Sequence, residues 1–425
     1  LQNRAGAALA AAGFDSLVLH SGRPPDVFLD DIHYPFKAHA PFKAWLPLTD
    51  APDCLLAFTP GRRPKLAFYS PDDYWHKPPS PPSGYWTDCF EIEIVGSPAA
   101  ARAALGQQLG RTAFIGDHFP ELHSFGFSAI NPEHLMARLD FDRAAKSPYE
   151  IECLREANRI GMRGHAAAEA VFRARGSEFA VELAFMAACG QREQELPYNP
   201  IIALNEHAAV LHYQVLETQP PARHRSLLID AGASFAGFAS DITRTYSFED
   251  TDFRDLILAM DQLQLGLCAE VRAGVDWADI QRMAYRRIGA LLCEADVLRS
   301  SVDEAVESGV VSAFFPHGIG HLLGLQVHDV GGRQRSHEGG EIPRPEGHPY
   351  LRLTRVLQEG FVVTMEPGLY FIDSLLTSAR SNGLGRQINW TRVEALAPFG
   401  GIRIEDNLAV TRGGCANLTR AAPGG

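Results

Sequence analysis

The chain has 425 residues, of which 46% are hydrophobic and 21% charged, a composition typical of a folded protein rather than a disordered one. Its formal net charge of −12 suits neither nucleic acid nor an anionic membrane, so we expect neither as a partner. Seven scattered cysteines without a Cys-x-x-Cys pair argue against a disulfide framework and against a cysteine-ligated zinc, and they favour a reducing cytoplasm.

The N-terminal third alternates short apolar segments with helical patterns. We expect strands at residues 16–20, 55–59, 65–69, 91–95 and 113–116. We expect helices at residues 4–12, 99–109 and 132–139. This order predicts an α/β domain with a mixed sheet, and the proline-rich residues 76–84 predict a surface loop. The opening residues are interpreted as a helix rather than a leader peptide, and no apolar run approaches a membrane span.

A helix start near Lys146 marks the expected domain boundary. Ser147 fits the N-cap position and Pro148 the first helical position. Glu150, three residues after Ser147, fits the N3 position of a capping box. Because the chain is long for one core, we expect two domains, residues 1–145 and 146–425. The helix that begins here is expected to run to residue 175, and a second helix to follow and end at residue 189. Two more helices are expected at residues 252–271 and 276–294. Residues 331–348 predict an irregular surface excursion.

Two aspartates lie on a predicted hairpin at residues 227–248. Asp230 closes an apolar run and Asp241 opens the return strand. A carboxylate at the end of a buried strand is costly unless it is paired or bound to a cation. Aspartates also cap turns, and this segment alone does not separate that interpretation from a metal site.

Three histidines follow within twelve positions. His317, His321 and His328 each stand next to glycine or aspartate in an apolar segment. Imidazole is a good ligand for divalent first-row metals, and the glycines around His321 permit close approach of the backbone. A single histidine there would more often be a buried core residue, but three favour a site.

Two glutamates complete the set of candidate ligands. Glu366 ends an apolar strand, and strand alternation places Glu405 on the same face as Arg403, which a plain ion pair would also explain. Four carboxylates and one imidazole carry too much negative charge for one cation in a buried pocket. Two divalent ions would balance that charge, and the oxygen-rich set favours Mn²⁺, with Co²⁺ or Zn²⁺ as alternatives.

The order of these residues resembles the pita-bread metallopeptidase family, which includes methionine aminopeptidase, aminopeptidase P and prolidase. Within the family the chain is similar to proteobacterial prolidases, through FLDD, YPFKAHAPFKAWLP, NEHAAVLHY, PHGIGHLLGLQVHDVGG, PYLRLTR and FGGIRIEDN. The resemblance implies a C-terminal pita-bread domain behind the N-terminal α/β domain. It implies as metal ligands Asp230, Asp241, His321, Glu366 and Glu405.

The resemblance also implies the chemistry. A water activated between the two metals would attack the Xaa-Pro bond of a dipeptide, and Glu366 would accept its proton and pass it to the proline nitrogen. His328 and His212 would contact the substrate and, with a metal, hold the developing oxyanion. Hydrolysis of some organophosphates is expected as a side reaction.

Two arginines and a loop of the N-terminal domain are expected to restrict the substrate to dipeptides. Arg352 is expected to bind the free carboxylate of the dipeptide, and Arg403 could fill this role or orient Glu405.

Prolidases are homodimers in which a loop of the N-terminal domain reaches the partner's active site, so this domain is expected to dimerise and restrict substrate length. Asp31 and Tyr34 are candidates for closing the pocket, although both could form turns. The rival hypotheses are an aminopeptidase P acting on longer peptides and a non-catalytic pita-bread binding module.

Overall fold

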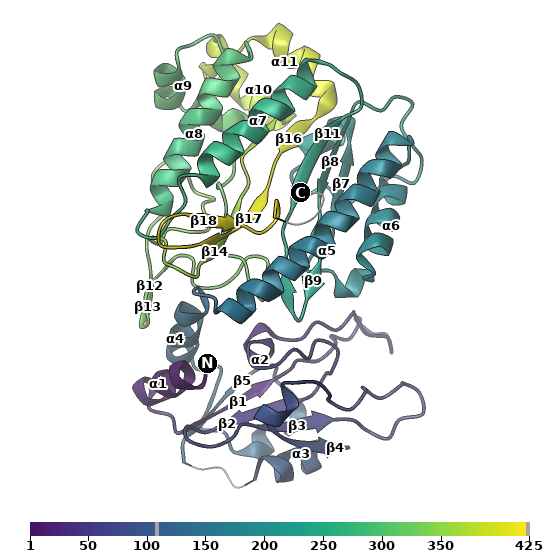
Figure 1. Cartoon of the computed structure of the whole chain (residues 1–425), viewed down its shortest axis with the longest axis vertical. Helices are drawn as coiled ribbons and strands as arrows, with labels where there is room; N and C mark the ends of the chain where they lie inside the picture. Colours follow the sequence, from purple (N-terminus) through teal and green to yellow (C-terminus); the bar gives the residue numbers. More distant parts are fainter. Residues whose placement is uncertain (107–109, 422–425) are drawn as a thin grey trace. The chain divides into compact units, whose positions relative to one another are not determined.

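The computed structural model describes residues 1–106 and 110–421, which form two compact units (Figure 1). Unit 1 comprises Leu1–Arg143 and Ser336–Gly340, and unit 2 comprises Ala144–Arg335 and Glu341–Gly425. The end of the helix predicted at residues 99–109 lies outside the described residues. In the described part of the chain, no helix combines the length and apolar character needed to cross a bilayer.

Unit 1 is built on a six-stranded mixed sheet in the order β4-β3-β2-β1-β5-β6. Its strands are β1 (Ser16–His20), β2 (Leu55–Phe58), β3 (Lys65–Tyr69), β4 (Glu91–Val95), β5 (Thr112–Ile115) and β6 (Ala129–Ile130). Strand β1 runs antiparallel to β2 and parallel to β5. The mixed sheet expected from the sequence is therefore present.

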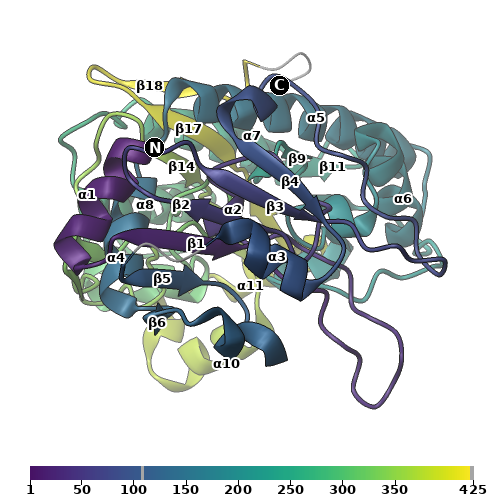
Figure 2. The ribbon, with the colours of Figure 1, turned by 90° about the horizontal axis from the view of Figure 1, so that it is seen from below.

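Helices cover both faces of this sheet because side chains alternate along its strands. Leu17 and Leu19 pack with buried residues of α1 (Gln2–Ala12) and α4 (Glu133–Arg143). Val18 faces the other way and packs with α3 (Pro98–Leu105), which lies across that face in Figure 2. The remaining helical turns of the unit are α2 (Ala40–Lys43), η1 (Thr87–Cys89) and η2 (Pro120–Phe125). Residues 76–84 form neither helix nor strand, as predicted.

Unit 2 contains antiparallel sheets. One has the order β11-β8-β7, a second β14-β17-β18, and the pairs β15-β16 and β10-β9 are two-stranded. The strands are β7 (Ile201–Leu204), β8 (Ser226–Asp230), β9 (Ser234–Phe235), β10 (Phe238–Ala239), β11 (Thr243–Ser247), β14 (Val362–Met365), β15 (Gly368–Tyr370), β16 (Gly401–Arg403), β17 (Asp406–Val410) and β18 (Cys415–Asn417). The hairpin expected at residues 227–248 is the β8-β11 pair, with β9 and β10 in its connection.

Two sets of helices pack against these sheets. The helices are α5 (Pro148–Arg173), α6 (Glu178–Cys189), α7 (Asp252–Cys268), α8 (Trp277–Glu294), α9 (Val302–Ser308), α10 (Asp373–Ser381) and α11 (Trp390–Leu396). Short 3₁₀ turns occur at η3 (Glu193–Glu195), η4 (Asn205–Ala209), η5 (Val310–Ala313), η6 (Leu384–Gln387) and η7 (Ala397–Phe399). Helices α5 and α6 share a core with β7 and β8, whereas α7 and α8 share one with β14 and β17 (Figure 1).

Helix α5 begins as the sequence predicts. The side chain of Ser147 accepts a hydrogen bond from the backbone of Glu150, whose carboxylate accepts one from the backbone of Ser147. This reciprocal capping box satisfies two backbone donors that the helix itself leaves unpaired.

The excursion at residues 331–348 is more regular than predicted. It contains a short hairpin of β12 (Gln334–Ser336) and β13 (Gly339–Glu341). None of these strand residues is buried and they carry no apolar alternation, so the sequence offered no period-two signal for them.

Candidate metal centre

The five side chains predicted as metal ligands converge in unit 2. Asp230 is the last residue of β8, and Asp241 lies two residues before β11. Glu366 directly follows β14, and Glu405 lies between β16 and β17. His321 stands next to Leu322, which bridges to Val363 of β14. Strand ends from distant parts of the sequence thus bring the five groups together.

Asp241, His321, Glu366 and Glu405 form the densest part of the cluster. The Nε2 atom of His321 lies 3.4 Å from Oδ2 of Asp241 and 3.5 Å from Oε1 of Glu366. Ligand atoms of Asp241, His321 and Glu405 all lie within 4.8 Å of one another, and these three residues are buried. The spacing is that of groups able to share cations.

Hydrogen bonds fix the orientation of His321. Its Nδ1 atom donates to the carbonyl of Leu322 at 3.0 Å, so Nε2, which faces the carboxylates, is the nitrogen available to a cation. Its backbone N–H donates to the hydroxyl of Thr364 at 3.1 Å, and that hydroxyl lies 3.3 Å from Oε1 of Glu366. His321 and Glu366 are therefore held through a shared threonine.

Asp230 is oriented by two donors. The hydroxyl of Tyr198 donates to its Oδ1 at 2.7 Å, and Nη2 of Arg403 donates to its Oδ2 at 2.7 Å. The Nε atom of Arg403 donates to Thr243 at 3.2 Å, and Thr243 donates to Glu405 at 2.7 Å. Arg403 is only 4% exposed, so its guanidinium links Asp230 and, through Thr243, Glu405.

A chain of hydrogen bonds continues from Arg403 to His317. Nη1 of Arg403 donates to the Tyr370 hydroxyl at 2.9 Å, and that hydroxyl lies 2.9 Å from Nε2 of His317. Nδ1 of His317 donates to the carbonyl of Gly318 at 2.9 Å, so Nε2 is the acceptor for Tyr370. Burial, with a smaller contribution from the charge of Arg403, lowers the pKa of His317 to about 3, which keeps this ring neutral.

The cluster holds an excess of negative charge. Burial raises the pKa of Glu366 to about 7, and burial with neighbouring Asp241 raises the pKa of Glu405 well above its ordinary value. Burial also raises the pKa of Asp230 in spite of Arg403. Four carboxylates facing one guanidinium and one imidazole cannot all stay ionised without further cations. This donor set of carboxylate oxygens and one imidazole fits divalent metal ions.

Burial raises the pKa of Asp241, but its hydrogen bond with His321 outweighs this, and the net pKa is lowered. Burial lowers the pKa of His321, yet Asp241 and Glu366 raise it overall. Without a metal, these two residues thus form an ion pair. A cation would replace the proton on Nε2 of His321.

The residues predicted to contact substrate lie beside this cluster in unit 2. The ring of His328 is 4.5 Å from the ring of His321, nearly perpendicular to it. Burial, with smaller contributions from the charges of His321, Arg352 and His212, lowers the pKa of His328 to about 4. The side chains of Arg352 and His212 are exposed, and His212 also lowers the pKa of His317.

Asp31 and Tyr34 belong to unit 1. Both are exposed and lie in the segment between β1 and α2, where the backbone of Tyr34 donates to the carbonyl of Pro25 at 2.8 Å. Their role in closing the pocket stays a prediction.

Several residues of the centre were not anticipated from the sequence: Tyr198, Thr243, Thr364 and Tyr370. Thr243 carried a usable signal, because the hairpin register places it directly opposite Asp230. Thr364 is two residues before Glu366, on the same face of its strand. Tyr198 and Tyr370 reach the centre only through tertiary packing.

Comparison with known proteins agrees with this geometry. The model of metallopeptidase family M24 matches residues 152–412. The chain belongs to this family. A second family model, for the N-terminal domain of Xaa-Pro dipeptidase, matches residues 1–141. The M24 family assignment implies divalent metal ions in the catalytic domain.

Relatives of similar length carry one name. A protein of Xanthomonas axonopodis pv. citri named Xaa-Pro dipeptidase is 50% identical over 421 residues, covering 99% of this chain and 95% of the relative. One of Shewanella oneidensis with the same name is 47% identical over 420 residues, covering 99% and 96%. The resemblance to proteobacterial prolidases is confirmed.

Solved structures extend the agreement to the fold. Pseudomonas aeruginosa aminopeptidase PepP superimposes with a TM-score of 0.75 at 22% identity, covering 99% of this chain and 94% of that one. Escherichia coli aminopeptidase P with the inhibitor Pro-Leu gives a TM-score of 0.71 at 20% identity, with the same coverage. The predicted pita-bread fold of this M24 protein is confirmed.

Proposed function

We propose that the protein hydrolyses the Xaa-Pro bond of dipeptides that end in proline. The observation that carries this proposal is the 47–50% identity, over nearly the whole chain, to proteins named Xaa-Pro dipeptidase. The convergence of Asp241, His321 and Glu405 within 4.8 Å supports a metal-dependent reaction at these residues.

The five clustered side chains would hold two divalent ions. The ligands would be Asp230, Asp241, His321, Glu366 and Glu405. Mn²⁺ suits this oxygen-rich set best, with Co²⁺ and Zn²⁺ as alternatives. When bound, the ions would polarise the substrate carbonyl and make water a nucleophile near neutral pH. The raised pKa values of Glu366 and Glu405 support this proposal, because they reflect negative charge that bound cations would offset.

Glu366 would move the proton. Its carboxylate would accept a proton from the attacking water and deliver it to the proline nitrogen, which must be protonated to leave. The contact with Thr364 at 3.3 Å and the neighbouring His321 would keep one carboxylate oxygen in a fixed direction.

His328 and His212 would act on the carbonyl oxygen. A neutral imidazole can donate one hydrogen bond, and the low pKa of His328 keeps it neutral at pH 7. Such a donor stabilises the negative charge that develops on the oxygen when water attacks.

Two arginines would have different roles, one in substrate binding and one in orienting a metal ligand. Arg352 is exposed and near His328, so its guanidinium could take the free carboxylate of a dipeptide as a bidentate partner. Arg403 is buried and donates to Asp230, so we assign it to ligand orientation rather than to substrate binding.

We further propose a homodimer formed through unit 1. The loop that carries Asp31 and Tyr34 exposes two large apolar side chains at its tip, with Phe28 87% and Leu29 90% exposed. Apolar side chains exposed together favour contact with a protein partner, and a second copy of this chain would cover them. Asp31 and Tyr34 would then close the pocket of that copy. Seven free cysteines support a cytoplasmic location.

The test is hydrolysis by chelator-treated protein after Mn²⁺, Co²⁺ or Zn²⁺ is added back. Proline release would be measured from Ala-Pro and Gly-Pro, and hydrolysis from the tripeptide Ala-Pro-Ala. We expect metal-restored cleavage of the dipeptides only. Equal or better cleavage of the tripeptide would identify an aminopeptidase P, and no cleavage with any metal would favour a binding module.

A further inference from the structure

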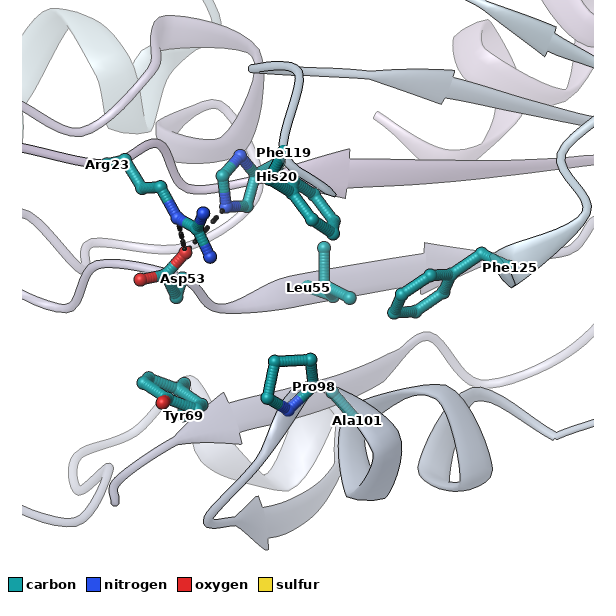
Figure 3. A pocket seen from close by; sticks show the side chains of 9 residues that line it. All are labelled: His20, Arg23, Asp53, Leu55, Tyr69, Pro98, Ala101, Phe119 and Phe125. Carbon is teal, nitrogen blue, oxygen red and sulfur yellow. Dashed lines mark hydrogen bonds and ion pairs between the residues drawn. The ribbon is translucent and has the colours of Figure 1, made fainter. Parts of the chain in front are cut away.

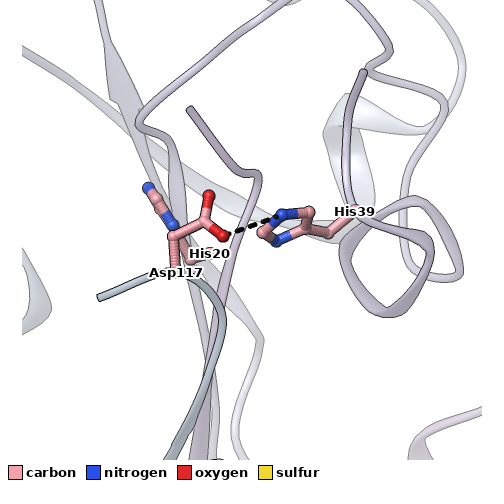
Figure 4. Close-up of side chains that lie close together, drawn as sticks. All are labelled: His20, His39 and Asp117. Atoms are coloured by element: carbon pink, nitrogen blue, oxygen red, sulfur yellow. Dashed lines mark ion pairs between the residues drawn. The ribbon is translucent and has the colours of Figure 1, made fainter. Parts of the chain in front are cut away.

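A second cluster of side chains of metal-binding types lies within unit 1. His20 is the last residue of β1, and Asp117 follows β5 by two residues. Because β1 and β5 are parallel, their carboxyl ends meet at one edge of the sheet. His39 joins them from the residue before α2 (Figure 4).

The three groups are close enough to share one ion. Their candidate ligand atoms all lie within 4.8 Å of one another, and Nε2 of His39 is 3.3 Å from Oδ1 of Asp117. Ligands of a tetrahedral zinc are about 3.4 Å apart, a separation that His39 and Asp117 already have. The other oxygen of Asp117 accepts from the backbone of Arg23 at 3.0 Å, which leaves Oδ1 for a cation.

His20 presents an unused lone pair. The side chain is buried, and its Nε2 atom lies 3.4 Å from Oδ1 of Asp53 (Figure 3). Asp53 also accepts from Nε of Arg23 at 2.6 Å, so it is a carboxylate and Nε2 of His20 carries the proton. Nδ1 is then an acceptor, and among the described residues it has no hydrogen-bond partner.

This arrangement is the one in which proteins orient a metal-binding histidine. A ligating imidazole typically donates its second nitrogen to a carboxylate, which fixes the tautomer and makes the ring a better ligand. A buried acceptor without a partner destabilises the fold, and a bound cation would remove that cost.

Glycines permit the close approach of both histidines. A Cβ at Gly22, where φ is +105°, would lie 2.9 Å from Nε2 of His39. A Cβ at Gly116 would lie 2.3 Å from Cβ of His20. Side chains at either position would displace the imidazoles from the cluster.

We propose that this cluster is a zinc site, with Nδ1 of His20, Nε2 of His39 and Oδ1 of Asp117 as protein ligands and water as the fourth. Two imidazoles and one carboxylate are a typical zinc donor set. The side chains of His39 and Asp117 are 32% and 39% exposed, which gives the ion a route of entry. His20 and His39 are the two ends of the loop at residues 21–38, so the ion closes that loop at its base.

The first test is zinc stoichiometry of the full chain after chelation and dialysis against buffered Zn²⁺. We expect wild type to bind one more tight equivalent than His39→Ala or Asp117→Asn. The matched control is His118→Ala, which removes an exposed neighbouring histidine and should bind as wild type does. Equal stoichiometry in all four proteins would overturn the proposal and leave only water at His20.

The second test is hydrogen exchange of the amides at residues 21–38. At free Zn²⁺ ten times its Kd, exchange that requires release of the ion should slow about tenfold in wild type and in His118→Ala. It should not respond to zinc in His39→Ala or Asp117→Asn, provided that circular dichroism shows both variants folded without metal. A zinc response retained in these variants would contradict the site. Neither test uses peptidase activity, so failure here is separable from failure of the proposed function.

Discussion

The carboxylate centre of unit 2 and the histidine cluster of unit 1 differ in the charge that they bury. The first combines four carboxylates with one imidazole, and burial raises the pKa of three of them, Asp230, Glu366 and Glu405. The second combines one partly exposed carboxylate with two imidazoles. A centre of the first kind depends on bound cations to stay ionised, whereas a cluster of the second kind can remain folded when empty. The amount of buried negative charge therefore decides how strongly each cluster depends on bound metal.

The largest effect should come from removing the proton carrier in the acidic centre. Glu366→Gln should lower kcat for Ala-Pro by about 10²–10⁴, because general acid-base catalysis contributes that much. Steady-state kinetics at saturating Mn²⁺ measure it. The matched control is Glu359→Gln, an exposed carboxylate paired with Arg412, which should leave kcat unchanged. A kcat within a factor of two of wild type would remove Glu366 from the mechanism.

A smaller loss should follow from removing the exposed cation beside the centre. Arg352→Ala should lower kcat/KM for Ala-Pro about 10- to 100-fold, since a hydrogen bond to a charged group contributes roughly 1.5–3 kcal/mol. Ala-Pro amide, which lacks the free carboxylate, should be cleaved equally by both proteins.

Exposed Arg254 offers the control substitution, Arg254→Ala, with no expected effect on either substrate. If Arg352→Ala lowered kcat/KM equally for Ala-Pro and Ala-Pro amide, the guanidinium of Arg352 would not bind the free carboxylate.

A third prediction concerns Arg403, which orients Asp230 in the carboxylate centre of unit 2. Arg403→Lys should weaken Mn²⁺ binding about 10- to 100-fold, because lysine cannot contact Asp230, Thr243 and Tyr370 together. Calorimetric titration of metal-free protein provides the Kd. Arg412→Lys, at an exposed ion pair, should bind Mn²⁺ as wild type does. An unchanged Kd in Arg403→Lys would show that the ligands need no such support.

The smallest effect is a dependence of stability on pH. Raised pKa values mean that Glu366 and Glu405 are protonated in the folded metal-free protein near neutrality. The contribution of Glu366 to stability is fully present below the unfolded pKa of about 4.3 and is lost as pH rises through about 7. Bound Mn²⁺ stabilises the ionised forms instead.

The gain in Tm on adding Mn²⁺ should therefore grow by a few degrees between pH 5 and pH 8. Calorimetric scans with and without chelator measure it. A gain that stays constant or shrinks over this range would mean that the carboxylates are not protonated in the metal-free fold.

Much of this molecule could be predicted from local sequence signals. Strand β1 at Ser16–His20 and the start of α5 at Pro148 were predicted correctly, because apolar runs and the capping box are local patterns. The convergence of Asp230 and Glu405 could be expected only from family resemblance, since the sequence alone left capping and ion-pair roles open. Tyr198 and Tyr370 were missed because their contacts depend on tertiary packing.

The account's central claim is that five side chains of unit 2 bind two metal ions. Anomalous X-ray scattering at the manganese edge, from a crystal soaked in Mn²⁺, tests it most directly. We predict two peaks among Asp230, Asp241, His321, Glu366 and Glu405. A single peak there, or none, would contradict the dinuclear centre.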